Sequence, residues 1–146
     1  MQNQSTRTVN IPWHFDVPRQ DVWHAWTNPQ MVLQWFGSDP NGKVLHAALE
    51  VRLGGTFEIT FANSDGTEFT CMGTYTEVQP AHKLVFTWSW TSSPDVVEFV
   101  TVALRDEPGG THMDFEIANI DPDTAHNYQP GWKSTFEKLG RALKET

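Results

Sequence analysis

The residues of this chain that could carry out chemistry are one cysteine, six histidines and a few carboxylates near its end. The histidines, His14, His24, His46, His82, His112 and His126, show no HExxH spacing and no His/Cys cluster, so their spacing predicts no metal site. Cys71 lies on an alternating segment, where we expect a small buried hydrophobic residue and not a reactive thiol. The sequence has neither a glycine-rich phosphate loop nor a GxSxG motif. We therefore identify no catalytic residue, expect no cofactor, and favour a binding protein over an enzyme.

One group of polar residues and one tyrosine are further candidates for a functional role. His112, Asp114 and Glu116 share one face of a predicted strand, with Glu98 as a possible neighbour across a hairpin. If the apolar residues between them face the core, this set is solvated; with the opposite parity, its carboxylates become buried groups with raised pKa values and acid or base potential. We favour solvation because the apolar face then fills the core. Tyr75, predicted to face inward, could donate a hydrogen bond to the oxygen of a bound ligand, although a tyrosine hydroxyl that reaches water at the cavity mouth is the commoner outcome.

The elements that must position these residues are clearest in segment 51–90. Period-two alternation predicts strands around residues 56–61, 68–78 and 84–90, with a tight turn at Asp65-Gly66. One face of this three-stranded unit is aromatic and carries Phe57, Phe61, Phe69, Tyr75, Phe86, Trp88 and Trp90. A face this large needs a cover.

The flanking sequence predicts the remaining elements. Residues 6–15 alternate as a strand, a short helix begins at Pro18, and a second has Asn28 as its N-cap with Pro29 at its first position. Further strands are predicted at 44–49, 96–105 and 111–118.

A long helix is predicted at the end of the chain and is the natural cover for the aromatic face. Asp121-Pro122-Asp123 has the composition of a helix start. From there one apolar stripe runs to a helix end near Thr146 and contains Tyr128, Trp132, Phe136, Leu139 and Leu143. Because Pro130 is costly inside a helix, we expect a kink or the true helix start near it.

Composition limits the class of protein. A chain of 146 residues with 38% hydrophobic content is most simply one domain, which we place at 6–146 after a flexible tail at 1–5. The net charge of −8 argues against a nucleic-acid partner. There is no signal-peptide pattern and no apolar run near the roughly 18 residues that a membrane span requires, so we expect a cytoplasmic protein without membrane insertion.

The order of these elements, together with particular residues, resembles the helix-grip fold of the START-like (SRPBCC) superfamily, and most closely its branch of stand-alone domains like the activator of Hsp90 ATPase. The residues that carry the resemblance span nearly the whole chain: Pro18, Val22-Trp23, Ala25, Thr27-Asn28-Pro29, Trp35-Phe36, Arg52-Leu53-Gly54-Gly55, Asp65-Gly66, Gly73-Thr74-Tyr75, Glu77-Val78, Pro80, Lys83-Leu84-Val85-Phe86-Thr87-Trp88, Gly109-Gly110-Thr111, Gly131-Trp132 and Leu139. Their order and spacing are typical of this fold, but they do not specify a function.

The resemblance implies an α+β fold in which a curved antiparallel sheet of six or seven strands wraps around the C-terminal helix, with two short helices after the first strand. It also implies an apolar cavity that holds lipid-like or polyketide-like molecules. The candidate lining residues are Trp35, Phe57, Phe61, Tyr75, Phe86, Trp88, Trp90, Phe99, Met113, Phe115, Trp132 and Phe136. Two alternatives remain open at this point: these side chains fill the cavity as a packed core, or they enclose a guest. The alternative functions are a chaperone-associated interaction protein and a cavity enzyme of the cyclase or hydratase type.

Overall fold

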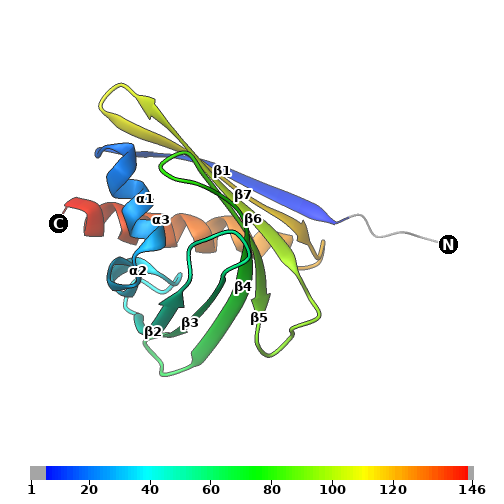
Figure 1. The fold of residues 1–146 in the computed structure, drawn as a ribbon. Helices are drawn as coiled ribbons and strands as arrows, with labels where there is room; N and C mark the ends of the chain where they lie inside the picture. The colour runs from blue at the N-terminus through cyan, green and yellow to red at the C-terminus, as the bar shows by residue number, and fades with distance from the viewer. Residues whose placement is uncertain (1–5, 145–146) are drawn as a thin grey trace.

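The computed structural model describes residues 6–144, which form one antiparallel sheet and three α-helices (Figure 1). The strands are β1 (Arg7–Phe15), β2 (Lys43–Leu49), β3 (Thr56–Ala62), β4 (Glu68–Gln79), β5 (Lys83–Trp90), β6 (Glu98–Glu107) and β7 (Gly110–Ile120). The helices are α1 (Arg19–Thr27), α2 (Pro29–Trp35) and α3 (Tyr128–Lys144), the last preceded by the short 3-10 helix η1 (Ala125–Asn127). The predicted flexible tail at 1–5 lies outside the described residues.

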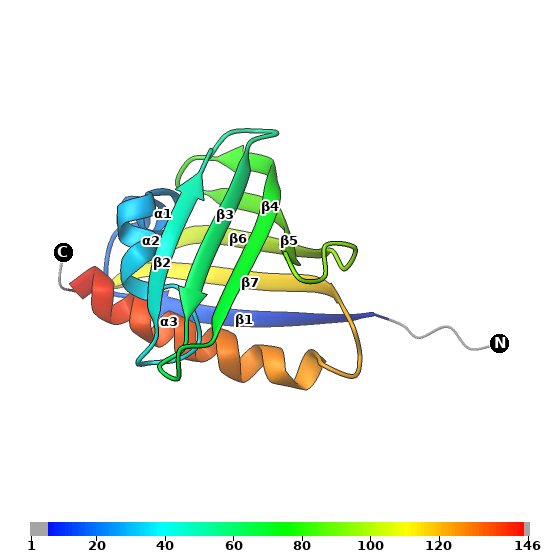
Figure 2. The ribbon, with the colours of Figure 1, turned by 90° about the horizontal axis from the view of Figure 1, so that it is seen from below.

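The seven strands form one sheet in the order β1-β7-β6-β5-β4-β3-β2. Strands β2 to β7 follow one another as antiparallel neighbours, while β1 pairs with β7 at the far edge. Figures 1 and 2 show the sheet curving around α3, with α1 and α2 stacked at one end of it. The predicted α+β helix-grip architecture is confirmed.

Helix α2 begins where the sequence predicts. The side-chain oxygen of Asn28 accepts a hydrogen bond from the Gln30 amide at 2.8 Å, and Pro29 takes the first helical position, where its missing N–H costs no intrahelical bond. This start places Met31, Val32 and Trp35 on the buried side of α2.

The C-terminal helix begins near Pro130, which is one of the two predicted alternatives, and not at Asp121. The Asp121 carboxylate accepts from the Asp123 amide at 2.9 Å in a turn, η1 follows, and the α-helix begins at Tyr128. The physical reason is Pro130: in the observed helix it lies in the first turn, where its missing N–H donor costs no intrahelical hydrogen bond, whereas a start at Asp121 would place it in the helix interior.

The side chains of β6 face the opposite way from the prediction. Glu98 and Val100 face the core, with 4% and 0% of their surface exposed, whereas Phe99 is 47% exposed on the outer face. The predicted inward orientation of Phe99 is therefore wrong, as is the outward orientation considered for Glu98. The apolar set Val100, Val102 and Leu104 determines the parity, because all three must be buried together.

The core is centred on the aromatic contacts of α3. Phe136 is fully buried, and its ring centroid lies 5.0 Å from that of Phe115 on β7 and 5.7 Å from that of Trp13 on β1. Trp26 of α1 also packs against Phe136, with centroids 6.3 Å apart. One side chain of α3 thus joins two strands and a helix.

We predict that Phe136→Ala lowers the free energy of unfolding by about 3–5 kcal/mol, because it removes this shared contact and leaves a cavity. Urea unfolding followed by tryptophan fluorescence measures the change. The matched control is Phe99→Ala, which removes the same ring from the outer face and should alter stability by about 0.5 kcal/mol or less. Equal losses in the two variants would contradict the central role of Phe136.

Candidate functional site

A pocket of about 200 Å³ lies between the sheet and the first turns of α3. Its lining is mostly aromatic and comprises Phe36, Gly37, Ser38, Phe61, Trp88, Trp90, Asn127, Tyr128, Gly131, Trp132 and Thr135. Ser38 and Asn127 are exposed to solvent, so the pocket has a polar rim and an aromatic interior.

Local structure explains why these residues meet. Tyr128, Gly131, Trp132 and Thr135 are spaced at i, i+3, i+4 and i+7, which places them on one face of α3. Gly37, which follows α2, has a φ of +102°, and a Cβ there would lie 3.1 Å from the Phe61 ring. Glycine is therefore required for the loop to approach β3.

The aromatic walls meet at steep angles. Trp88 and Trp90 lie 5.4 Å apart at 82°, although alternate residues of one strand point to the same face. Phe36 and Trp132 lie 6.1 Å apart at 87°, and Trp88 contacts Trp132 at 5.5 Å. Ring faces and ring edges are thus both presented around the pocket.

The space deeper in the sheet is almost completely filled. A void of about 20 Å³ remains there. Its lining comprises Trp26, Val32, Trp35, Phe36, Leu49, Phe57, Ile59, Tyr75, Leu84, Phe86 and Trp88. Phe36 and Trp88 line both spaces and stack with centroids 5.8 Å apart at 30°, so this pair forms the partition between them. Among residues 6–144, the buried Trp26 indole N–H has no hydrogen-bond partner.

The twelve residues predicted from the sequence divide into four groups. Phe61, Trp88, Trp90 and Trp132 line the pocket. Trp35, Phe57, Tyr75 and Phe86 line the inner void, as Trp88 also does. Met113, Phe115 and Phe136 are fully buried in the packed core, and Phe99 lies outside.

Several residues that line the pocket were not among the candidates predicted from the sequence. Tyr128, Gly131 and Thr135 could have been found by following the helical period from Trp132. Phe36, Gly37 and Ser38 carried no such signal, because their position depends on how the end of α2 packs against the sheet.

A buried carboxyl group lies behind the pocket. Glu98 pairs across β5 and β6 with Trp88, and its Oε2 accepts a hydrogen bond from the Tyr128 hydroxyl at 2.5 Å. Its other oxygen is buried and has no hydrogen-bond partner among the described residues. Burial raises the pKa of Glu98, and burial together with this hydrogen bond raises the pKa of Tyr128. Glu98 itself does not line the pocket.

The rim is attached to α3 by two polar contacts. The Ser134 hydroxyl donates to the Ser38 carbonyl at 2.7 Å. Lys138 Nζ donates to the Asp39 carbonyl at 2.9 Å and lies 3.5 Å from the Phe36 carbonyl. Burial lowers the pKa of this lysine. These bonds hold the loop after α2 in the place where it forms the pocket wall.

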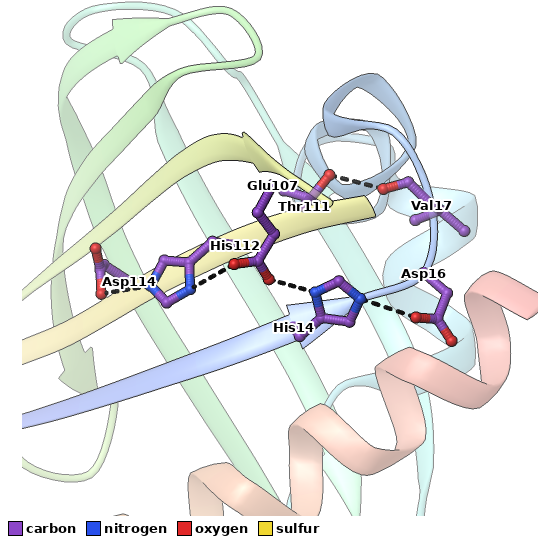
Figure 3. Close-up of polar contacts among 7 residues, drawn as sticks. All are labelled: His14, Asp16, Val17, Glu107, Thr111, His112 and Asp114. Carbon is purple, nitrogen blue, oxygen red and sulfur yellow. Dashed lines mark hydrogen bonds and ion pairs between the residues drawn. The ribbon is translucent and has the colours of Figure 1, made fainter. Parts of the chain in front are cut away.

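A second polar group lies on the outer face of the sheet (Figure 3). Glu107 bridges two histidines: one carboxylate oxygen bonds to His14 Nδ1 and the other lies 3.6 Å from His112 Nδ1. The remaining ring nitrogens bond to Asp16 at 2.8 Å and to Asp114 at 3.0 Å. The bond to Glu107 raises the pKa of His14 despite opposing desolvation. The predicted outward orientation of His112 and Asp114 is confirmed.

Within residues 6–144, no three His, Cys, Asp or Glu side chains are arranged to hold a metal ion. Cys71 is fully buried, and burial raises the pKa of its thiol. None of the helices in the same range has both the length and the apolar character to cross a bilayer.

We predict that Glu98→Gln stabilises the protein at alkaline pH. Because the folded-state pKa of Glu98 is raised, the wild type has its full stability below the ordinary carboxyl pKa and loses part of it as the pH rises through the folded-state value. The variant lacks this loss, so its advantage in unfolding free energy should be larger at pH 8 than at pH 4. Urea unfolding at both pH values measures it.

The control is Glu116→Gln, which removes a carboxylate from the exposed face of β7 and should show no comparable growth. If the variant Glu98→Gln exceeded the wild type in unfolding free energy by the same amount at both pH values, ionisation of Glu98 would not be the cause.

Solved structures show the same fold. A protein of Nitrosomonas europaea matches with a TM-score of 0.81 at 20% identity, covering 94% of each chain. The AHSA1-like protein of Aeromonas hydrophila matches with a TM-score of 0.80 at 23% identity, over 95% of this chain and 93% of that one. A protein of Mesorhizobium loti matches with a TM-score of 0.75 at 27% identity, over 96% and 98%. No curated protein matches the chain.

The family model described as "Activator of Hsp90 ATPase homolog 1-like protein" matches residues 16–144. This range includes every element after β1 and all the pocket residues. The chain therefore belongs to the activator of Hsp90 ATPase homolog 1-like family.

Proposed function

We propose that the protein binds a small, largely apolar molecule in the pocket between the sheet and α3. The observation that carries this proposal is the partly open aromatic pocket itself, bounded by Phe36, Trp88 and Trp132 and rimmed by exposed Ser38 and Asn127. Ligand sites are typically lined by aromatic side chains with a few polar groups that set orientation, and this pocket has that composition.

The size of the pocket limits the ligand. At about 200 Å³ it is smaller than the roughly 300–1,000 Å³ of common ligand pockets. A molecule of one or two rings would fit beside Trp132. A longer ligand requires the Phe36–Trp88 stack to part, which would join the pocket to the inner void lined by Tyr75 and Phe57.

The position of Glu98 favours ligand binding over catalysis. Glu98 is the buried carboxyl group near the pocket, but Tyr128 stands between it and the ligand space. A general acid or base must lie within hydrogen-bond reach of the reacting atom. The cavity-enzyme alternative therefore has weaker support than ligand binding.

Chaperone association is the alternative suggested by the family description. It is tested by measuring the turnover of the heat-shock ATPase with and without the protein, alongside a pull-down. Unchanged turnover and no recovered ATPase would dispose of it.

We predict that Gly131→Leu blocks the pocket without unfolding the protein. A Cβ at Gly131 would meet only Ser38 at 3.7 Å, an ordinary contact, so the larger side chain can extend into the pocket. The affinity for 2-naphthol, a neutral two-ring fluorophore that matches the size of the pocket, should fall at least tenfold. Thermal stability should hold or rise, because leucine is favoured over glycine in helices by roughly 0.5–1 kcal/mol.

Gly140→Leu is the matched control, since it makes the same change in α3 where a Cβ would lie 4.0 Å from Phe15 and away from the pocket. It should keep the probe affinity of the wild type. If the wild type binds no probe and native mass spectrometry finds no co-purifying small molecule, the proposed function is wrong.

A further inference from the structure

We propose that the pocket selects an organic cation: an amine or quaternary ammonium group on a short apolar body. This inference rests on the proposed function and specifies the chemical class of its ligand. It is carried by two independent features, the arrangement of aromatic rings in the pocket and the buried Glu98–Tyr128 pair behind it.

The pocket presents the side chains that attract cations. Six of its residues are aromatic: Phe36, Phe61, Trp88, Trp90, Tyr128 and Trp132. The face of an aromatic ring carries negative potential, and tryptophan is the strongest of these rings, so cages of such residues bind ammonium groups. Trp88 and Trp90 meet at 82°, and Phe36 and Trp132 meet at 87°, so the rings of each pair pack edge to face and not as one stacked layer.

The polar group in the wall favours a hydrogen-bond donor. The Tyr128 hydroxyl donates its proton to Glu98 Oε2, so toward any further partner its oxygen can only accept, and the Thr124 side chain also hydrogen-bonds to it. A ligand N–H or O–H can be satisfied there, whereas a carbonyl or carboxylate cannot. This is the reverse of the donating role expected for Tyr75 from the sequence.

Glu98 supplies a charge for which the protein offers no complete partner. Its Oε1 is buried without a hydrogen bond among residues 6–144, and burying a carboxylate without compensation is costly. The raised pKa of Glu98 reflects this environment. A cation on the other side of Tyr128 would stabilise the ionised form. Glu98 thus acts through Tyr128, as a positioning residue.

The nearest buried cation of α3 does not fill this role. Lys138 lies ten residues beyond Tyr128, about 15 Å along the helix axis, and donates to the carbonyls of Asp39 and Phe36. The net charge of −8 also favours the approach of cations over anions.

The test compares choline with its uncharged carbon isostere, 3,3-dimethylbutan-1-ol, which has the same shape and the same hydroxyl. Each is titrated into the full chain in competition with 2-naphthol and, separately, by calorimetry. We expect choline to bind at least tenfold more tightly than the isostere. Equal or tighter binding of the isostere overturns the cation assignment and leaves the proposed function standing.

Two variants distinguish a charge effect from a structural one. Glu98→Gln keeps an acceptor for Tyr128 but removes the charge, and Tyr128→Phe removes the hydroxyl; each should reduce the ratio of choline to isostere affinity at least threefold. Glu116→Gln, on the outer face, should leave the ratio unchanged. A purely structural role of Glu98 would weaken both ligands equally and overturn the assignment. Probe binding with no displacement by choline also overturns it, whereas failure of the probe itself contradicts the proposed function.

Discussion

The contact between α3 and the concave face of the sheet is the interaction on which the rest of the structure depends. The strands alone would expose a continuous aromatic surface, and burial of that surface is the main free-energy gain available to this chain. Phe136 supplies the centre of the contact, reaching Phe115 on β7 and Trp26 on α1. The positions of α1 and of the β1 edge follow from this one helix.

The same helix produces both a closed core and an open pocket. Toward its C-terminal end, Phe136, Leu139 and Leu143 are buried in the core, and a separate, more polar hollow of about 400 Å³ lies between this end of the helix and β1. Toward its N-terminal end the stripe continues with Trp132, but Gly131 has no side chain and the surrounding residues are only partly covered. The aromatic pocket thus lies beside Gly131, where α3 contributes no side chain between Tyr128 and Trp132.

Much of this fold could be predicted from periodicity, since the strands from β2 to β5 and the Asn28–Pro29 helix start have local causes. The start of α3 could be predicted only as one of two alternatives, because Asp121 carries a local cap signal whereas Pro130, through the cost of an interior proline, favours a start near itself. The parity of β6 was missed because Phe99 is the most apolar side chain on its own face. The inward face becomes clear only when the residues on the other face of the same strand are considered together: Glu98, Val100, Val102 and Leu104. The pocket is less predictable still, since Phe36 and Ser38 reach it through tertiary packing of α2.

Glu98 connects these observations, because it breaks the hydrophobic pattern at the one inward position of β6 next to the pocket. The strand register places it opposite Trp88, and the helix places Tyr128 within hydrogen-bond distance of it. An apolar residue there would extend the core without the cost of burying a carboxyl group. The free-energy cost of burying this carboxyl group therefore arises next to the pocket. A bound ligand can offset it there. Polar groups elsewhere on the sheet, such as His14 and Glu107, instead lie on the outer face, where water and neighbouring charges already satisfy them.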